Sequence, residues 1–576
     1  MRYGKTRRPQ FLTTDVFQIL RSWYPDGSHY RLTRFWIQRT LGLIYLIAFL
    51  IAANQYIPLA GEHGLLPARL FLKQVHFGDA PSVFFLNWSD AFITIIIWCG
   101  LVLSVIAFAG ISDAFGMTIS VMVWALLWLL YLSLVNVGQV FYGFGWEMLL
   151  LETGFLAIFF GPTKSKPPTV IFWLVLWILF RTMFGAGMIK LRGDECWRDL
   201  TCLFYHHETQ PLPNPLSWYL HHLPQSALKM GVLFNHFVEL IVPWFFFAPR
   251  RLRCVAGGFT ILFQVVLILS GNLSWLNYIT IVLCIACFDD KSLSRLTPKF
   301  LMHPPHLNPL PQRGEEETAA GPAGFGSIGQ RPSRETTSDI PSPLAGEGRA
   351  RGVAVFHRLG NCLRIPIEDA YPKTLSLPHA TAVSVLTLLV LLLSIQPALN
   401  LFSRQQLMNA SFNPLHLVNT YGAFGSVTKQ RYEIIIEGTD SEKPDENAVW
   451  KEYEFKGKPG DLHRRPCLVS PYHWKLDWQM WFAAMSPYQY HPWILNLVAK
   501  LLEGDTKVLS LMAKNPFPDT PPKFIRAELY LYHFTDSRED GAWWRRQHVG
   551  NYLPPLSLSD PEFRRVLKEQ GWLDVN

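Results

Sequence analysis

The stretch FRTMFGAGMIKLRGDECWRDLTCLFYHHETQPLPNPLSWYLHHLP, residues 180–224, guides the interpretation of the whole chain. It begins inside a strongly apolar segment, and we expect the chain to leave that helix at Gly185, Gly187 and Lys190. Several charged side chains follow within a few residues, and then a segment dense in His and Pro. A soluble core does not need this order, whereas a membrane helix that delivers a charged, structured loop to the surface does. We call residues 190–226 the signature loop.

Composition indicates a membrane protein that crosses the bilayer many times. Of 576 residues, 49% are hydrophobic and only 17% are charged. The apolar residues form blocks, which is typical of membrane spans. The first block starts near Gln38, too late for a cleaved signal peptide, so the first helix is expected to be retained. The eight cysteines often lie within apolar runs, and we do not expect them to form a disulfide framework.

Windows of roughly 17–25 apolar residues predict about nine membrane spans. The spans lie near residues 38–57, 89–110, 116–138, 143–161, 168–189, 228–248, 254–271, 273–288 and 379–396. The seventh and eighth are short and are separated only by Gly271 and Asn272. The predicted fold class is a multi-pass α-helical membrane protein with a C-terminal extracytoplasmic α+β domain.

Lys and Arg near the predicted helix ends indicate the orientation, because such residues favour the cytoplasmic side. The residues concerned are Arg31, Arg34, Lys164, Lys166, Arg250, Arg251, Arg253, Lys291, Arg295 and Lys299. With nine spans they all fall on one side, which places the signature loop outside. The predicted domains are a cytoplasmic tail (1–37), an eight-span membrane domain (38–289), a cytoplasmic linker (290–376), a ninth span (377–396) and an external domain (397–576).

Residues 303–352 differ in composition from the rest of the chain, being rich in Pro, Gly, Ser and charge. Such a segment cannot bury enough apolar surface to offset the entropy of ordering, so we expect it to be disordered. Its flanks, NPLPQRGEE and PSPLAGEGRARG, resemble translated copies of a dispersed bacterial repeat, which points to a bacterial source.

The external domain shows strand and helix patterns. Residues 431–438, 452–457 and 527–535 have the alternating or aromatic-rich character of strands. Trp493 to Glu503 has the apolar spacing of an amphipathic helix. The run YHWKLDWQMWF, residues 472–482, fits a domain core and also fits a segment lying on the membrane surface.

Polar groups inside the predicted spans are candidate functional residues, because burying charge in hydrocarbon is expensive. The intramembrane polar cluster consists of Glu147, Glu152, Arg181, His236 and Glu239. Glu152, Arg181 and Glu239 come at similar depths, so these groups are able to converge in one polar pocket. Structural ion pairs between helices are the favoured interpretation, and we predict a pair between Glu152 and Arg181.

Several words of the sequence resemble the lipase maturation factor family, namely GDECWRDLTC, HHETQPLPNP, FNHFVELIVPWFFF, GNLSWLNY, NTYGAFGSVTKQRYE, RRPCLVSPYHWKLDWQMWFAA and NYLPPLSL. The resemblance covers most of the chain outside residues 303–352. It implies a membrane-bound factor whose external domain holds folding lipases, in the endoplasmic reticulum or in a bacterial inner membrane. The implied partners are client lipases and membrane lipid, with no nucleic acid, cofactor or metal.

The signature loop supplies the expected client or packing surface, consisting of Arg192, Asp194, Trp197, Arg198, Asp199, His207 and Glu208. A metal site at His206, His207, His221 and His222 is disfavoured, because their spacing does not place ligands at i and i+4 on one helical face. Packing and hydrogen bonding against neighbouring aromatic residues is the favoured role for these histidines.

The sequence leaves enzymatic activity open but favours a folding factor. The end of the helix, FGAGMIKLRGDECW, also resembles the corresponding part of vitamin K-dependent gamma-glutamyl carboxylase, which implies Lys190 as a catalytic base. The competing interpretation of Lys190 is a lysine that extends its ammonium to the membrane interface. No G-x-S-x-G elbow occurs, so the chain does not resemble a lipase.

Overall fold

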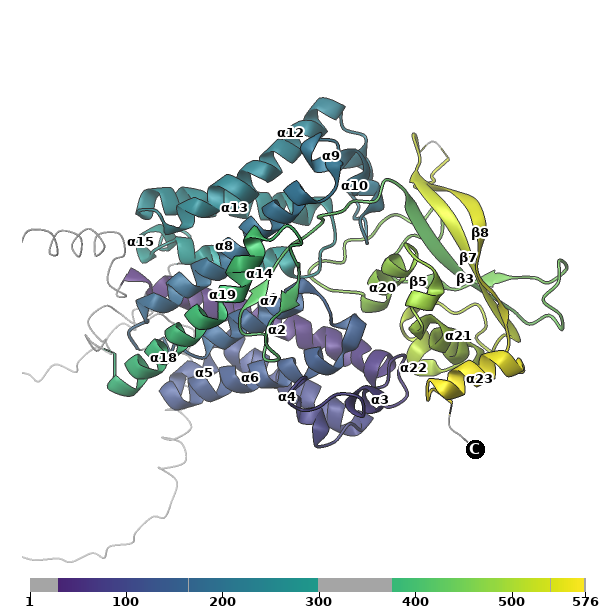
Figure 1. The fold of residues 1–576 in the computed structure, drawn as a ribbon, viewed down its shortest axis with the longest axis horizontal. Coiled ribbons are helices and arrows are strands. Elements are labelled where there is room, and N and C mark those ends of the chain that lie inside the picture. Colours follow the sequence, from purple (N-terminus) through teal and green to yellow (C-terminus); the bar gives the residue numbers. More distant parts are fainter. Residues whose placement is uncertain (1–28, 164, 299–374, 539, 574–576) are drawn as a thin grey trace, which may run out of the picture.

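The computed structural model describes residues 29–163, 165–298, 375–538 and 540–573. A helical bundle occupies one end of the molecule and a domain with a β-sheet occupies the other (Figure 1). This arrangement confirms the predicted fold class, a multi-pass helical protein with a C-terminal α+β domain. The predicted disordered segment 303–352 lies outside the described residues.

Within the described residues, seven helices are long and apolar enough to cross a membrane. They are α2 (Arg31–Ala60), α4 (Asp90–Ala109), α6 (Met117–Val137), α8 (Thr169–Arg192), α12 with η4 and η5 (Gln225–Phe247), α13 (Arg250–Ser270) and α18 with α19 (Leu377–Phe402). The π-helical segment η4 covers Phe237–Ile241 and the 3-10 segment η5 covers Val242–Phe247. In the last span, α18 covers Leu377–Leu393 and α19 covers Ile395–Phe402.

The predicted fourth and eighth spans correspond to shorter helices. They are α7 (Gly145–Ala157, 13 residues) and α14 (Leu276–Cys284) with η6 (Ile285–Cys287). Neither is long enough to cross a bilayer as a helix, so the prediction of about nine full-length helical spans is wrong at these two places. Both are largely enclosed by the other helices, and backbone buried in protein need not be helical across the full membrane thickness.

The segment of α14 and η6 nevertheless connects the two ends of the bundle. We call the end where α2 begins the basal end, and the end next to the C-terminal domain the domain end. Asn272, before α14, donates to Cys467 O of the C-terminal domain (2.8 Å), whereas Phe288 O, after η6, accepts from Thr33 in the first turn of α2 (2.8 Å). The chain therefore passes from one end of the bundle to the other between residues 272 and 288.

The basal end collects basic side chains from separate connections, as the sequence predicted. Arg34 donates to Thr163 O (2.7 Å), and Arg253 donates to the hydroxyl of Tyr30 (2.7 Å). Arg250 pairs with Asp289 at the same end. Helix α2 begins at Arg31, well before the predicted start near residue 38, so Arg34 lies in its first turn and is buried.

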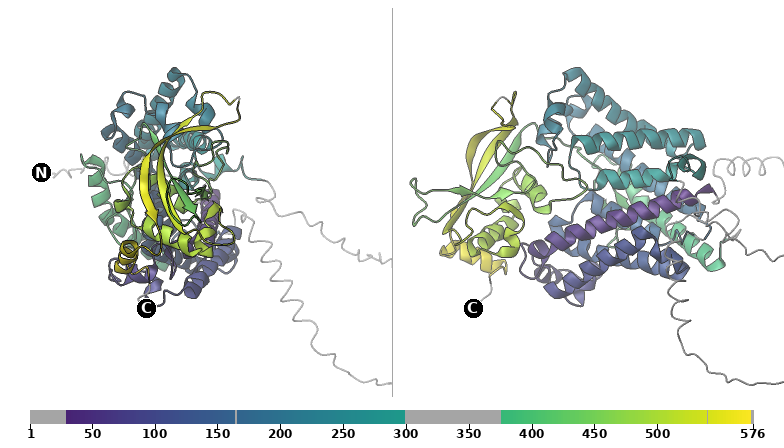
Figure 2. Two further views of the ribbon diagram at one scale, coloured as in Figure 1. Left: turned by 90° about the vertical axis from the view of Figure 1, so that its right-hand side faces the viewer. Right: turned by 180° about the vertical axis from the view of Figure 1, so that it is seen from behind.

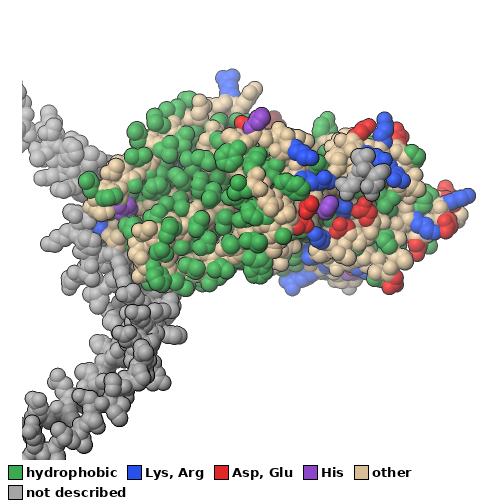
Figure 3. Space-filling model, turned by 90° about the horizontal axis from the view of Figure 1, so that it is seen from below, with side chains coloured by type: hydrophobic (Ala, Val, Ile, Leu, Met, Phe, Trp, Pro, Cys, Tyr) green, Lys and Arg blue, Asp and Glu red, His purple; other side chains and the backbone are tan. Residues whose placement is uncertain are grey.

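The face of the bundle seen in Figure 3 is covered mainly with apolar side chains, whereas charged side chains gather over the C-terminal domain. On α4, Ile95, Trp98 and Val102 are each more than half exposed, and on α13 the same is true of Val255 and Leu262. A water-soluble protein rarely exposes such a continuous apolar surface. These helix faces are the part of the molecule that contacts lipid hydrocarbon.

The C-terminal domain is built on a four-stranded antiparallel sheet in the order β4-β3-β7-β8. Its strands are β3 (Arg431–Thr439), β4 (Lys451–Glu452), β7 (Phe524–Phe534) and β8 (Trp544–Leu556). Two small sheets pair β1 (Ala410–Ser411) with β2 (Asn419–Thr420) and β5 (Glu454–Phe455) with β6 (Met512–Lys514). The predicted strands at 431–438 and 527–535 are confirmed, and 452–457 forms only the two short strands β4 and β5.

Helices of the C-terminal domain lie between the sheet and the bundle (Figures 1 and 2). They are α20 (Lys475–Ala483), α21 (Trp493–Glu503) and α22 (Thr506–Leu509), with α23 (Pro561–Glu569) at the end of the domain. The predicted helix Trp493–Glu503 matches α21 at both ends. Alternation along β3 directs Ile434 and Ile436 into the main core, and Ile435 into a cluster on the opposite face of the sheet.

The remaining elements are short. They are α3 (Ala68–Leu72), η2 (Val83–Phe85), α5 (Ile111–Ala114), η3 (Gln139–Phe141), α9 (Glu195–Arg198), α10 (Leu203–Thr209), α11 (Ser217–His221), α15 (Asp290–Leu293) and η8 (Tyr488–Tyr490).

Helix α8 continues to Arg192, so the expected exit from the helix at Gly185, Gly187 and Lys190 is wrong. The glycines serve close packing instead. A Cβ atom at residue 185 would lie 2.5 Å from the carbonyl oxygen of Tyr421, in the segment that leads into the C-terminal domain. The absence of a side chain at Gly185 therefore lets that segment lie directly on α8.

We expect Gly185→Ala to lower the stability of the protein by about 1–3 kcal/mol, because the methyl group would displace the backbone at Tyr421. Gly258→Ala on α13 is the matched control, since a Cβ there meets no atom within 4 Å. The measurement is the midpoint of thermal unfolding of the purified proteins in detergent. Equal midpoints for the two variants would contradict the close approach at Gly185.

Candidate functional site

The first contact between the bundle and the C-terminal segment is made by Glu152 and Arg181. These side chains form a buried ion pair, which confirms the predicted pairing. Glu152 also accepts hydrogen bonds from the backbone N–H of Asn419 (3.1 Å) and from the hydroxyl of Tyr421 (2.6 Å), while Arg181 donates to Asn419 O. The membrane charges therefore bind β2 and the residues after it.

A second buried ion pair joins α7 to α20. Lys475 donates to Glu147 Oε1 (2.7 Å), and neither side chain is exposed. The hydroxyl of Tyr131 on α6 donates to the other carboxylate oxygen of Glu147. Burial lowers the pKa of Lys475, and the adjacent Glu147 carboxylate acts in the opposite direction. The pairing partner of Glu147 is thus supplied by the C-terminal domain.

The third pair lies at the end of α8. Lys190 donates to Glu239 Oε1 (2.6 Å) and to Asn235 Oδ1 (3.0 Å), and its ammonium lies 5.0 Å from the centre of the Trp197 ring. Lys190 is 4% exposed. The interpretation of Lys190 as a lysine extending to the membrane interface is therefore wrong, because the side chain is enclosed and ion-paired inside the protein.

The residues of the intramembrane polar cluster do not meet in one place. Glu147, Glu152 and Glu239 each have their own cationic partner, and only Glu239 lines the large cavity described below. His236 contacts the carbonyl oxygen of Trp197 through Nε2 (3.0 Å). The expectation of a single polar pocket is wrong because the partners come from different elements at different places.

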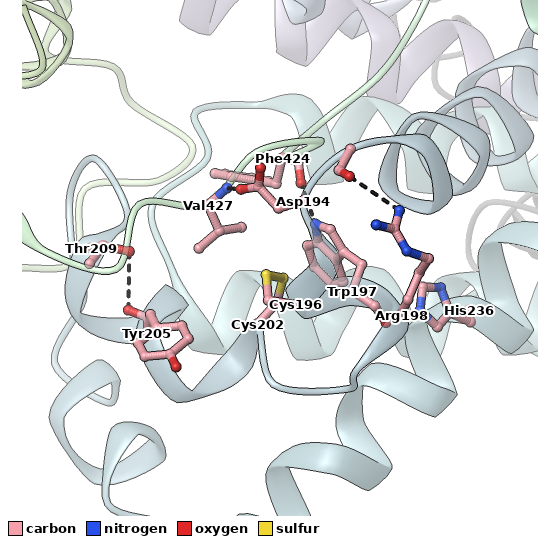
Figure 4. Close-up of a disulfide and its surroundings, with 11 residues drawn as sticks. Asp194, Cys196, Trp197, Arg198, Cys202, Tyr205, Thr209, His236, Phe424 and Val427 are labelled. Atoms are coloured by element: carbon pink, nitrogen blue, oxygen red, sulfur yellow. Dashed lines mark hydrogen bonds between the residues drawn. A yellow bond between two sulfur atoms is a disulfide. The ribbon is translucent and has the colours of Figure 1, made fainter. Parts of the chain in front are cut away.

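The signature loop contacts the C-terminal segment through Asp194 and Trp197 (Figure 4). The carboxylate of Asp194 accepts from the backbone N–H of Val427 (2.6 Å), and the Trp197 indole donates to Phe424 O (2.8 Å). The backbone N–H of Asp194 donates in addition to Gly425 O (3.0 Å). These three bonds fasten the loop to residues 424–427, which belong to one of the words that carry the family resemblance.

A disulfide joins Cys196 and Cys202 inside the signature loop (Figure 4). The sequence analysis expected no disulfide framework, so this bond was missed. Both cysteines are buried beside Trp197 and Val427. The disulfide closes a short turn that carries Trp197 toward Phe424.

The two arginines and the second aspartate of the loop differ in exposure. Arg192 donates to Leu401 O (2.8 Å) and to Gln406 Oε1 (2.6 Å), so it belongs to the packing surface. Arg198 is exposed and donates to carbonyls at the end of α8, among them Leu191 O (3.0 Å). Asp199 is exposed as well. Arg198 and Asp199 are the two predicted site residues of the loop that a partner is able to reach directly.

His207 and Glu208 lie in the interior of the junction. Glu208 accepts from the backbone N–H of Phe534 (2.8 Å) and contacts His533 Nδ1 (3.0 Å), which ties the loop to β7. Burial lowers the pKa of His206 to about 4 and that of His207 to about 3, so both rings are neutral at neutral pH. Among the described residues, no group of three or more His, Cys, Asp and Glu side chains is arranged to hold a metal ion.

The run YHWKLDWQMWF becomes α20 and the residues before it, and it is buried at the junction. Gln55 near the end of α2 donates to His473 O (2.7 Å), and Trp481 donates to Thr209 O in the signature loop (2.9 Å). Lys475 and Trp478 are buried. The alternative of a helix lying on the membrane surface is wrong, since this run is enclosed between the bundle and the sheet.

Sequence reasoning missed several residues that hold the junction together. They are Lys475, Asn419, Tyr421, Asn272, Arg431 and the Cys196–Cys202 disulfide. All except Cys196 and Cys202 lie outside the signature loop. Polar residues embedded in the words GNLSWLNY, NTYGAFG and YHWKLDW were the available signal, because a polar group beside so many apolar ones is often buried with a partner.

A cavity of about 580 Å³ lies between the bundle and the C-terminal domain. Its walls come from α8, α12, α13 and α14, from the signature loop, and from residues 408–428 and 478–485. The walls are mainly apolar, and Lys190, Asn235 and Glu239 form one polar corner.

Together these contacts define a polytopic membrane protein whose C-terminal domain is fastened to the bundle by buried ion pairs and by a disulfide-closed loop. Family models of the lipase maturation factor transmembrane domain and C-terminal domain match residues 32–295 and 417–554. The chain therefore belongs to the lipase maturation factor family, as the motifs indicated.

Named relatives agree over nearly the whole chain. Mouse lipase maturation factor 1 is 43% identical over 570 residues, which is 94% of this chain and 89% of the relative. Human lipase maturation factor 1 is 42% identical over 95% of this chain and 93% of its own length. Human lipase maturation factor 2 is 32% identical over 94% and 85%. No solved structure matches the chain.

We expect Arg181→Met to destabilise the protein by about 3–5 kcal/mol, because it leaves the Glu152 carboxylate buried without its cation. Adding Glu152→Gln should recover part of that loss, since an amide still accepts the hydrogen bond from Tyr421 and carries no charge. The measurement is thermal unfolding of the two single variants and the double variant in detergent. Additive losses in this double-mutant cycle would show that the two side chains are not coupled.

Proposed function

We propose that this protein is a membrane-bound maturation factor that assists the folding and assembly of secreted lipases. The carrying observation is the match to both family models, together with relatives named for lipase maturation over more than nine-tenths of the chain. The words that resemble the family also contain most of the side chains that fasten the bundle to its external domain. The resemblance to the family thus covers the contacts between the two domains as well as the domains themselves.

The proposed client surface is the exposed rim of the junction and the adjoining face of the C-terminal domain. Arg198 and Asp199 are exposed there, and Leu468 and Tyr490 are 65% and 77% exposed. Partly folded chains expose apolar surface and strand edges. A rigid face with separate apolar, aromatic and charged side chains is suited to hold such a chain without burying it permanently.

The proposed orientation places the basal end in the cytoplasm and the C-terminal domain outside. The support is the collection of Arg34, Arg250 and Arg253 at the basal end, because cytoplasmic ends of membrane helices are enriched in Arg and Lys. The external side would be the periplasm in a bacterium or the lumen of the endoplasmic reticulum in a eukaryote. Residues 397–576 would then meet clients after translocation.

No contact of Lys190 favours the carboxylase alternative. Its ammonium donates to the Glu239 carboxylate and the Asn235 amide, and these three residues form a closed set of hydrogen bonds. A general base needs a free lone pair directed at the substrate. The contacts of Lys190 are those of a structural ion pair, so one function is proposed.

Expression of this protein should restore lipase maturation in mammalian cells that lack lipase maturation factor 1 and produce a secreted lipase. The measurement is lipase activity in the medium per unit of lipase antigen, and we expect it to rise several-fold. Asp199→Lys should reduce this rise, because it reverses a charge on the proposed client surface. Glu562→Lys on α23 is the control, being an exposed carboxylate outside the signature loop. Correctly inserted protein that leaves the ratio unchanged would refute the proposal.

Labelling with a membrane-impermeant maleimide should modify Tyr490→Cys from outside intact cells, because Tyr490 is highly exposed on the C-terminal domain. Arg251→Cys at the basal end should react only after the membrane is opened. Both substitutions are made together with Cys467→Ser, which removes a partly buried thiol of the same domain. The reverse pattern of labelling would overturn the orientation.

A further inference from the structure

The cavity at the junction has the dimensions of a ligand site. Its volume of about 580 Å³ falls within the range of roughly 300–1,000 Å³ that is typical of small-molecule sites. It lies where α13 and α14 of the bundle meet α20 of the C-terminal domain, so both domains contribute walls. A ligand there would contact both domains at once.

Apolar side chains form most of the cavity wall and reach the surface of the bundle. Phe263 and Leu267 on α13 line the interior together with Trp478 and Phe482 on α20. Val266 lines the cavity and is 45% exposed. It lies one helical turn from Leu262, which belongs to the lipid-facing side of α13. The cavity is therefore adjacent to the hydrocarbon region of the membrane.

The charged side chains that line the cavity cancel one another. They are Lys190 and Glu239, which are paired at 2.6 Å. The imidazoles of His206 and His207 also line the cavity, and burial keeps both neutral. An anionic head group would meet no unpaired Lys or Arg side chain among these lining residues, so the wall favours an uncharged ligand.

Asn277 on α14 supplies an unused hydrogen-bonding group. It lines the cavity, it is 1% exposed, and neither its amide nitrogen nor its amide oxygen has a partner among the described residues. Leaving a buried polar group without a partner costs about 1–3 kcal/mol. An amide presents one donor and one acceptor side by side, which a hydroxyl group or an ester beside a hydroxyl matches.

From this geometry we propose that the cavity binds an uncharged membrane lipid with one long apolar chain, whose hydroxyl or ester end hydrogen-bonds to Asn277. The apolar part packs along α13 and against the aromatic side chains of α20. Entry occurs beside Val266 from the half of the membrane next to the C-terminal domain. This binding site goes beyond the proposed function and does not depend on it.

Binding at this place stabilises the junction. Because the lipid contacts α13 and α14 on one side and α20 on the other, it binds the docked arrangement and not a separated one. A ligand that binds only the native arrangement raises its stability in proportion to the logarithm of ligand concentration. The lipid thus complements the ion pair between Glu147 and Lys475.

The test uses the full-length protein in detergent micelles and a monoacylglycerol whose acyl chain carries a diazirine. After illumination, the label should appear in peptides covering residues 261–285 and 476–485, and excess unmodified monoacylglycerol should remove it. Lysophosphatidic acid with the same diazirine chain is the charged counterpart, and it should label these peptides much less. Equal or stronger labelling by lysophosphatidic acid would overturn the assignment of an uncharged ligand.

Two variants separate specific binding from general contact with micelles. Asn277→Leu keeps the approximate volume and should reduce labelling by the monoacylglycerol about tenfold, the effect of one buried hydrogen bond. Val266→Trp should reduce it by narrowing the entrance, whereas Leu262→Trp, on the lipid-facing side of the same helix, should not. If Asn277→Leu does not fold, the comparison of Val266→Trp with Leu262→Trp decides whether the lipid binds in the cavity. Labelling that is unchanged in Val266→Trp, or confined to the outer face of α13, would refute the site.

Discussion

The fold depends on charges that lie inside the membrane bundle and are satisfied by the domain outside it. Glu147 pairs with Lys475, and Glu152 accepts hydrogen bonds from Asn419 and Tyr421 in addition to Arg181. A buried carboxylate that loses its cation costs about 3–5 kcal/mol, which is a large share of the stability of a typical domain. The bundle and the C-terminal domain are therefore not independent bodies joined by a linker. Each supplies groups that the other needs in order to be stable.

The signature loop extends this dependence around the rim of the junction. Its beginning is held to residues 424–427 by Asp194 and Trp197, and its middle is held to β7 by Glu208. The loop thus joins the bundle to the C-terminal domain, and its exposed charges include Glu195, Arg198 and Asp199. This explains how a stretch so rich in polar residues is able to connect two membrane helices. Several of its polar side chains, among them Asp194, Trp197 and Glu208, bond to backbone groups of the C-terminal segment and domain.

Patterns within single elements were predictable from the sequence, and contacts between elements mostly were not. The apolar blocks predicted the seven long helices, and the spacing of apolar residues predicted α21 at both ends. Strand β8 was missed because Pro554 and Pro555 argue against a strand, although an edge strand tolerates proline. The candidate site residues show the same contrast between local patterns and contacts across the chain. The pair of Glu152 with Arg181 was predicted from depth, whereas Lys190 was placed at the interface, because no local pattern reveals a partner forty-nine residues away.

The pairing of Glu147 with Lys475 has a consequence for how the chain folds while it is being synthesised. The two residues are 328 positions apart, and chains are made at about 5–20 residues per second, so Lys475 emerges roughly 16–66 seconds after Glu147. During that interval α7 has been made, but the cation that completes its site has not. Until Lys475 arrives, the nascent bundle is incomplete. Glu147 then lies among apolar side chains, and Tyr131 is the partner already made. A protein proposed to assist other chains during folding thus passes through a prolonged incomplete stage of its own.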